Sequence, residues 1–306
     1  MMLLSFPFGV FVVFNTDIGD DINFQYPLNH LSIFEDIGYF IPDSVELGDA
    51  FIVLWSFYAI LFAIAIFGPN NGFLKTLSIN LNRRNLDTKS NYMLTIVKWF
   101  SILILVSIII DSIQNEIGIV TLPPKIDNDL IQFLYVSISP IAEEFGFRLI
   151  LIGLPLFIFY SHKLSFTHFF KSLWNPNRHL HLYDIRKPLF LIVFVGVLFG
   201  LAHILTGEPW SEGKFAQATA SGIILGWLYF RFGLISAILV HWGTNYFIFS
   251  YANFVSHVNQ ITTEEAFVHP LMTAMELLFL ISGIFCVFVL ITGYFNKKNE
   301  QKIKIE

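Results

Sequence analysis

The chain has 306 residues, of which 55% are hydrophobic and only 13% are charged, and its formal net charge is −5. A soluble domain is about 25% charged, so this composition excludes an ordinary soluble globule. Several apolar runs reach the roughly 18 residues that a helix needs to cross a bilayer. We therefore predict an all-α, polytopic transmembrane helical bundle that lies in the lipid bilayer of the cell membrane.

The apolar runs predict about eight spans, or seven if the short first run does not cross. In chain order they are residues 3–14, 50–68, 93–110, 129–160, 188–205, 215–230, 234–251 and 271–295. Proline is favoured in the first turn of a helix, so Pro140 predicts that the proper fourth helix runs from about 140 to 160. No repeat or linker divides the chain, which predicts one membrane domain over residues 1–306.

The loops alternate in charge. Basic residues dominate the loops after the second, fourth and sixth spans and the C-terminal tail, whereas the other loops are acidic or nearly neutral. The positive-inside rule places the basic set in the cytoplasm. The basic loop after the fourth span also holds four histidines, which we interpret as part of a solvated loop, with a metal site as the alternative: His162, His168, His179 and His181.

Small residues recur every four positions in two spans. They are Gly196 and Gly200 in the fifth span, and Ala218, Gly222 and Gly226 in the sixth. Membrane helices associate closely through such residues. We expect these two helices to pack against neighbours in the centre of the bundle.

The fourth span contains three charged residues, Glu143, Glu144 and Arg148. A charge at membrane depth costs roughly 2.5–3.5 kcal/mol on insertion scales, so each needs a partner or a function. Glu144 and Arg148 are four residues apart, in the order that favours an intrahelical ion pair. Glu143 has Phe147 at the corresponding position and needs a partner on another helix.

Three polar residues on other spans are candidate partners: His203, His241 and Asn245. A carboxylate beside an imidazole can activate water, and imidazole and carboxamide N–H groups suit an oxyanion. Alternatively, Glu143, His203 and His241 supply three ligands to Zn²⁺ and leave one position for water. Metal-free and zinc mechanisms both stay open, as does a proton relay or ion site in a transporter.

Three segments, Glu143–Arg148 (EEFGFR), Phe199–His203 (FGLAH) and His241–Asn245 (HWGTN), resemble the motifs of the CPBP intramembrane proteases. That family includes the type II CAAX prenyl endopeptidases (Ras-converting enzymes) and bacterial proteins linked to bacteriocin self-immunity. The resemblance covers about residues 138–250 and implies a protease-like core at about 130–251.

The resemblance implies a peptidase of the metallo- or glutamate type that acts on membrane-associated or prenylated, CAAX-type protein substrates. Glu143 and His203 would activate water. His241 and Asn245 would stabilise the oxyanion or complete a metal site, and Glu144 and Arg148 would brace the site.

Two other functions compete with the peptidase: a non-enzymatic immunity or scaffold protein, and a transporter with a buried carboxylate relay. We expect a membrane-associated protein or peptide substrate, lipidated or not, and no nucleic acid partner. The loop charges place the site in the outer half of the membrane, whereas a CAAX protease of cytosolic proteins should open toward the cytoplasm. Either the orientation or registers are wrong, or the substrate is not a cytosolic CAAX protein.

Overall fold

The computed structural model describes residues 15, 42, 45–68, 71–83, 91–121, 129–181, 184–205 and 210–303. Contacts divide the chain into two compact units, Met1–Ile64 and Ala65–Glu306. Every element in the described residues is a helix, which confirms the predicted fold class. The predicted first span at residues 3–14 lies outside the described residues.

The first unit contains most of helix α3 (Leu47–Phe67), which corresponds to the predicted second span. Its entry is capped by Asp49, whose carboxylate accepts a hydrogen bond from the Glu46 backbone N–H at 3.0 Å. The helix is apolar on all sides, as expected for a membrane span.

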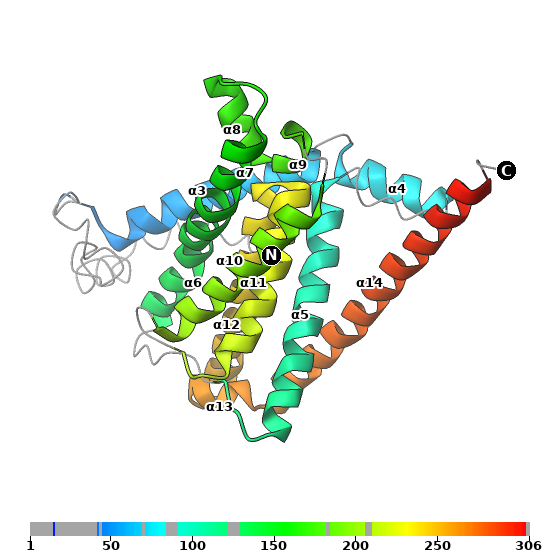
Figure 1. Ribbon diagram of the computed structural model, residues 1–306. Coiled ribbons are helices and arrows are strands. Elements are labelled where there is room, and N and C mark those ends of the chain that lie inside the picture. Colours follow the sequence, from blue (N-terminus) through cyan, green and yellow to red (C-terminus); the bar gives the residue numbers. More distant parts are fainter. Residues whose placement is uncertain are drawn as a thin grey trace. The chain divides into compact units, whose positions relative to one another are not determined.

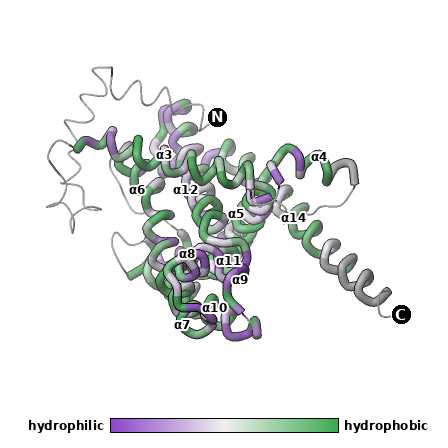
Figure 2. Tube along the Cα trace, turned by 90° about the horizontal axis from the view of Figure 1, so that it is seen from above, coloured by the Kyte–Doolittle hydropathy of each residue, from purple (hydrophilic) through white to green (hydrophobic). Residues whose placement is uncertain are grey.

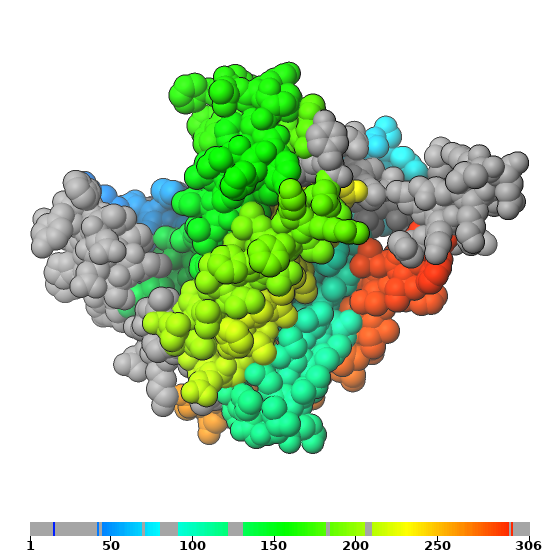
Figure 3. All heavy atoms as spheres, in the orientation of Figure 1, coloured from blue at the N-terminus to red at the C-terminus, as the bar shows by residue number. Residues whose placement is uncertain are grey.

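The second unit holds the other helices and the candidate site (Figure 1). In chain order they are α4 (Phe73–Arg83), α5 (Tyr92–Glu116), α6 (Asp129–Glu143), η5 (Glu144–Gly153), α7 (Leu154–Tyr160), α8 (Phe166–Trp174), α9 (Pro176–His179), α10 (Arg186–Leu205), α11 (Lys214–Phe232), α12 (Leu234–Asn259), α13 (Thr263–Phe267) and α14 (Pro270–Ile303). Helix α12 packs against α5, α6 and α11, and α14 lies beside α5 (Figure 3). Helices α8 and α9 lie at the end of this unit opposite α13 (Figure 1).

Four helices are long and apolar enough to cross a membrane, namely α3, α5, α10 and α14 through Gly293. The coloured part of α14 is largely hydrophobic, whereas α4 and the α8–α9 region carry hydrophilic stretches (Figure 2). The protein is thus a multi-pass membrane protein. The other predicted spans that the structure describes also form helices, and their crossing of the membrane stays a prediction.

Pro140 does not begin a helix, contrary to the prediction, but lies inside α6. Proline lacks an N–H and therefore removes one hydrogen bond from the helical ladder. Shortly after it, at Glu144, the chain changes to a π-helix of ten residues, η5, before α7 restores the α-helical geometry. Hydrogen bonds in a π-helix run to the fifth residue, and such segments are rare and often lie at functional sites.

The glycines of α10 and α11 bring these two helices into close contact, as the spacing predicted. A Cβ atom on Gly222 would lie 3.0 Å from the Cα of Gly196, and one on Gly196 would lie 2.9 Å from the backbone nitrogen of Ile223. At the far end of α11, Gly233 makes the predicted tight turn with φ of +95°. Only glycine adopts such a conformation readily.

Candidate active site

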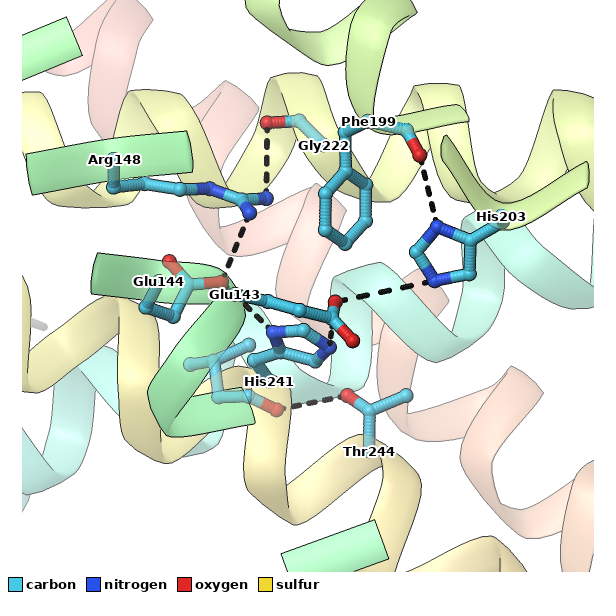
Figure 4. A network of polar contacts seen from close by, with 9 residues as sticks. Glu143, Glu144, Arg148, Phe199, His203, Gly222, His241 and Thr244 are labelled. Atoms are coloured by element: carbon cyan, nitrogen blue, oxygen red, sulfur yellow. Dashed lines mark hydrogen bonds and ion pairs between the residues drawn. The ribbon is translucent and has the colours of Figure 1, made fainter. Parts of the chain in front are cut away.

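The three sequence motifs meet in the second unit (Figure 4). The end of α6 and start of η5 supply Glu143, Glu144 and Arg148, whereas α10 supplies His203 and α12 supplies His241. Helix α12 packs against α6, α10 packs against η5, and this arrangement holds the side chains together. Most of the predicted site residues therefore form one cluster.

Glu144 lies at the buried centre of this cluster and has no solvent exposure. Its Oε1 atom lies 3.2 Å from Nη1 of Arg148, so the predicted ion pair is present. The same oxygen accepts a hydrogen bond of 2.8 Å from Nδ1 of His241. This second contact was not predicted, and it links η5 to α12.

Arg148 is the largest fully buried side chain of the described residues. Its guanidinium carbon lies 4.3 Å from the centre of the Phe199 ring, a cation–π geometry. Its Nη2 atom also donates to the carbonyl of Gly222 at 3.5 Å. Buried ions need such compensation, because an unpaired charge in an apolar interior is costly.

Phe199 connects Arg148 to both histidines. Its ring centre lies 4.6 Å from that of His203 and 5.8 Å from that of His241. The residue is 2% exposed. Its role was missed at the sequence level, although it stands one turn before His203 in the F-x-x-x-H segment.

Glu143 points between the two imidazoles (Figure 4). Its Oε2 atom lies 3.7 Å from Nε2 of His241 and 3.9 Å from Nε2 of His203. The Glu143 side chain is 26% exposed, whereas that of Glu144 is fully buried. Of these adjacent carboxylates, Glu143 is thus the one that a reactant can approach.

Hydrogen bonds on the far side of each ring determine which nitrogen faces Glu143. Nδ1 of His203 donates to the carbonyl of Phe199 at 2.8 Å, because a carbonyl only accepts. Nδ1 of His241 donates to the ion-paired carboxylate of Glu144. In the neutral rings, Nε2 therefore carries the lone pair, and both lone pairs face Glu143.

The same three atoms are the predicted zinc ligands. A ring N–H that donates to a carboxylate or carbonyl is typical of metal-binding histidines. However, no group of three His, Cys, Asp or Glu residues in the described ranges is arranged to hold a metal ion. Bond lengths of about 2.0–2.1 Å place tetrahedral zinc ligands roughly 3.4 Å apart, and the distances of 3.7 and 3.9 Å are wider than this. The donors fit zinc in kind but not in spacing.

Asn245 lies one turn after His241 on α12, but no hydrogen bond joins it to the charged cluster in the described part of the chain. Instead it lines a cavity of about 1030 Å³ together with His203, His241 and Thr244. Apolar side chains of α5, α12 and α14 form much of the remaining wall. A cavity of this size can enclose most of the surface of a drug-sized ligand, so a short peptide segment fits its scale.

The histidines of the basic loop form a separate cluster. The rings of His162 and His181 stack with centres 3.9 Å apart, and the ring of His168 lies 4.7 Å from that of His162. Desolvation and the nearby imidazoles lower the pKa of His162. They form no group that could hold a metal among the described residues, so the metal alternative finds no support in their arrangement.

The fold and the site together define a class: a multi-pass membrane protein with a carboxylate–imidazole cluster beside an internal cavity. Residues 128–247 match the family model described as type II CAAX prenyl endopeptidase Rce1-like. This segment contains all the site residues, so the chain carries a domain of this peptidase family, and the resemblance drawn from the three motifs is confirmed. No curated protein and no solved structure matches the chain.

Proposed function

We propose that this protein is an intramembrane endopeptidase in which Glu143 and His203 activate a water molecule that hydrolyses a peptide bond. The observation that supports this most directly is the accessible Glu143 carboxylate, which faces the Nε2 atoms of two oriented histidines. A general base must lie within reach of the proton that it accepts. A water molecule hydrogen-bonded to Glu143 would also be within reach of the His203 lone pair.

In the proposed reaction, water gives a proton to Glu143 while its oxygen attacks the carbonyl carbon of the substrate. The carbonyl electrons move to the oxygen and form a tetrahedral oxyanion. His241 and Asn245 are proposed to stabilise this oxyanion, since preorganised donors contribute strongly to such steps. The C–N bond then breaks, and Glu143 returns the proton to the leaving amine.

Glu144 and Arg148 are proposed to support this site without contacting the substrate. Glu144 holds the His241 ring in one orientation through its hydrogen bond, and Arg148 neutralises Glu144. With both histidines neutral, the cluster of Glu143, Glu144 and Arg148 carries one net negative charge. That charge favours a proton or a developing cation at the point between Glu143 and the imidazoles.

The substrate is proposed to be a membrane-associated protein, and the family description suggests a prenylated, CAAX-type C-terminus. The cavity contains residues from the end of α5, the start of α11 and α13. These are ends of the bundle that the loop charges predict to lie outside the cell. A substrate that reaches the site from that side is consistent with the geometry, and a cytosolic CAAX protein would require the opposite orientation.

The chain Glu143–His241–Glu144 also favours one alternative, a transporter that relays protons through buried carboxylates. Reconstituted protein would then support pH-dependent flux into liposomes and would cleave no peptide. A scaffold or immunity protein would show neither activity.

Purified protein in detergent should cleave members of a library of membrane-anchored and lipidated peptides. Loss of a general base lowers rates by about 10²–10⁴-fold, so Glu143→Gln should reduce cleavage by at least that range. The matched control is Glu212→Gln, because Glu212 is exposed and lies outside the cluster. Full cleavage by folded Glu143→Gln protein would exclude the proposed role.

A further inference from the structure

Lys214, the first residue of α11, is the one lysine or arginine among the described residues that line the cavity. Its side chain is half-buried, and its ammonium lies 3.9 Å from the centre of the Trp210 ring. In the described part of the chain, the ammonium forms no ion pair with a carboxylate. A half-buried ammonium on an aromatic ring therefore faces the space next to the site.

The backbone around Lys214 is tied to the active site. The N–H of Trp210 donates to the carbonyl of His203 at 3.0 Å. The side chain of Gln114 on α5 donates to the carbonyl of Gly213 at 2.8 Å. Gly213 is also closely packed, because a Cβ atom there would lie 2.9 Å from the carbonyl oxygen of Val120. Lys214 is thus positioned relative to His203 before any ligand arrives.

The charge of Lys214 acts on the site itself. It interacts electrostatically with both Glu143 and His203, and also with Asp111 on α5. Asp111 accepts a hydrogen bond of 3.1 Å from Gln217. Two further carboxylates, those of Glu264 and Glu276, line the cavity. The cavity is therefore not a general anion site but offers one localised positive charge.

We propose that Lys214 binds a carboxylate of the substrate, either the C-terminal carboxylate or a side-chain carboxylate a few residues from the scissile bond. This inference rests on the proposed peptidase function. Charge-assisted hydrogen bonds between lysine and carboxylate are short and about twice as strong as neutral ones. Binding at Lys214 would place the substrate's acidic end beside His203 and the scissile bond near Glu143.

The test compares three peptides of one cleavable sequence: one with a free C-terminal carboxylate, one with a C-terminal amide, and an amide with glutamate as the last residue. With the unaltered protein, we expect the KM of the neutral amide to exceed that of the free acid by about tenfold or more, as for loss of one charge-assisted bond. The glutamate peptide separates the two sources of the carboxylate. If it matches the free acid, a side-chain carboxylate suffices, and if it matches the neutral amide, Lys214 reads the chain end.

In Lys214→Met, the ratio of the two KM values should fall to near one, whereas Lys214→Arg should retain most of it. Lys163→Met is the matched control, because Lys163 is exposed in the loop before α8, and it should keep the full ratio. A preference that survives in Lys214→Met would overturn the inference. An equal loss of kcat for all three peptides would do the same, because it indicates oxyanion stabilisation or a structural role.

The two proposals fail in different ways. Cleavage of acid and neutral amide peptides with equal KM by the unaltered protein would overturn the role of Lys214 and leave the peptidase intact. This comparison needs no variant, so it holds even if Lys214→Met does not fold. If the unaltered protein cleaves no peptide, the peptidase function fails, and the inference about Lys214 falls with it.

Discussion

Glu143 and Glu144 are neighbours in the chain with different surroundings. Glu144 is fully buried between Arg148 and His241, whereas Glu143 is partly exposed and faces two imidazole lone pairs. A carboxylate that already accepts two charged or polar partners is poorly placed to take up a proton from water. At the scale of single residues, this division separates a supporting acid from a reactive one.

Arg148 should contribute strongly to stability. Its replacement leaves Glu144 as a buried carboxylate without its cation, and removing one partner of a buried ion pair costs about 3–5 kcal/mol. We therefore expect Arg148→Met to lower the thermal unfolding temperature in detergent. Arg178→Met is the control, because Arg178 is exposed and should tolerate the change. Equal unfolding temperatures for both variants would contradict this account of the ion pair.

The spacing of the three candidate ligands predicts how activity responds to metal removal. Because Oε2 of Glu143 lies 3.7 and 3.9 Å from the two Nε2 atoms, we expect Glu143 to act on water directly. Cleavage should then continue after treatment with a chelator, and metal analysis should find well under one equivalent of zinc. Activity that is lost with the chelator and restored by Zn²⁺ would instead show that the three side chains close around a metal.

At the scale of elements, the close contact between α10 and α11 positions two parts of the site. Helix α10 carries Phe199 and His203, and α11 offers the carbonyl of Gly222 to Arg148. The glycines allow this approach because a larger residue would push the backbones apart. The same contact therefore contributes both to packing and to the geometry around Arg148.

Gly196→Ala should separate these helices. Its new Cβ would lie 2.5 Å from the side chain and 2.9 Å from the backbone nitrogen of Ile223. Overpacking typically costs about 1–3 kcal/mol, so we expect a lower unfolding temperature and reduced peptide cleavage. Gly293→Ala on α14 is the control, since a Cβ there meets nothing within 4 Å. A Gly196→Ala protein as stable as this control would contradict close packing through Gly196.

Sequence patterns predicted contacts within one segment better than contacts between segments. The Glu144–Arg148 pair was predictable because residues four apart lie on one side of both an α-helix and a wider π-helix. That Glu143 would meet His203 and His241 followed from the cost of unpaired charge in an apolar run. The hydrogen bond from His241 to Glu144 was not predictable, because it depends on the rotation of α12 relative to η5. Nor did any residue type indicate η5, since Pro140 was read as the start of a helix.

Helix ends and loops show a similar limit. The structure extends the predicted seventh span from 251 to Asn259, and the loops contain short helices that were not expected, α4, α8, α9 and α13. Helix α13 has a capping box in which Thr262 and Glu265 bond to each other's backbone N–H groups. The T-x-x-E sequence of such a box was visible, but the segment was too short to appear as a helix by its apolar pattern.

At the scale of the whole molecule, the central helices are less apolar than the outer ones. Helices α11 and α12 carry many of the buried residues, whereas only 11% of the α14 span window is buried. Lipid-facing helices need an apolar surface all round, but interior helices can carry polar groups that pair with neighbours. This explains why hydropathy marks α5, α10 and α14 more clearly than the helices that build the site.

The charge pattern of the loops predicts the orientation of the protein. On a Cys286→Ser background, Lys163→Cys should react with a membrane-impermeant thiol reagent only after cells are permeabilised. Glu264→Cys should react in intact cells. Both positions are exposed in the structure, and Cys286 is the one cysteine of the chain. The reverse labelling pattern would place the cavity toward the cytoplasm and would favour a cytosolic CAAX substrate.

The π-helix η5 has a consequence for how this sequence can change in length. Each of its turns holds one residue more than an α-helical turn. Deleting one residue from its later part would allow an α-helix to form, and would rotate all that follows by about 100° relative to Glu143. Gly153, now packed against Tyr229, would then turn away from α11. Single-residue insertions and deletions here should therefore be far more harmful than substitutions at its exposed positions, Phe145, Ile150 and Leu151.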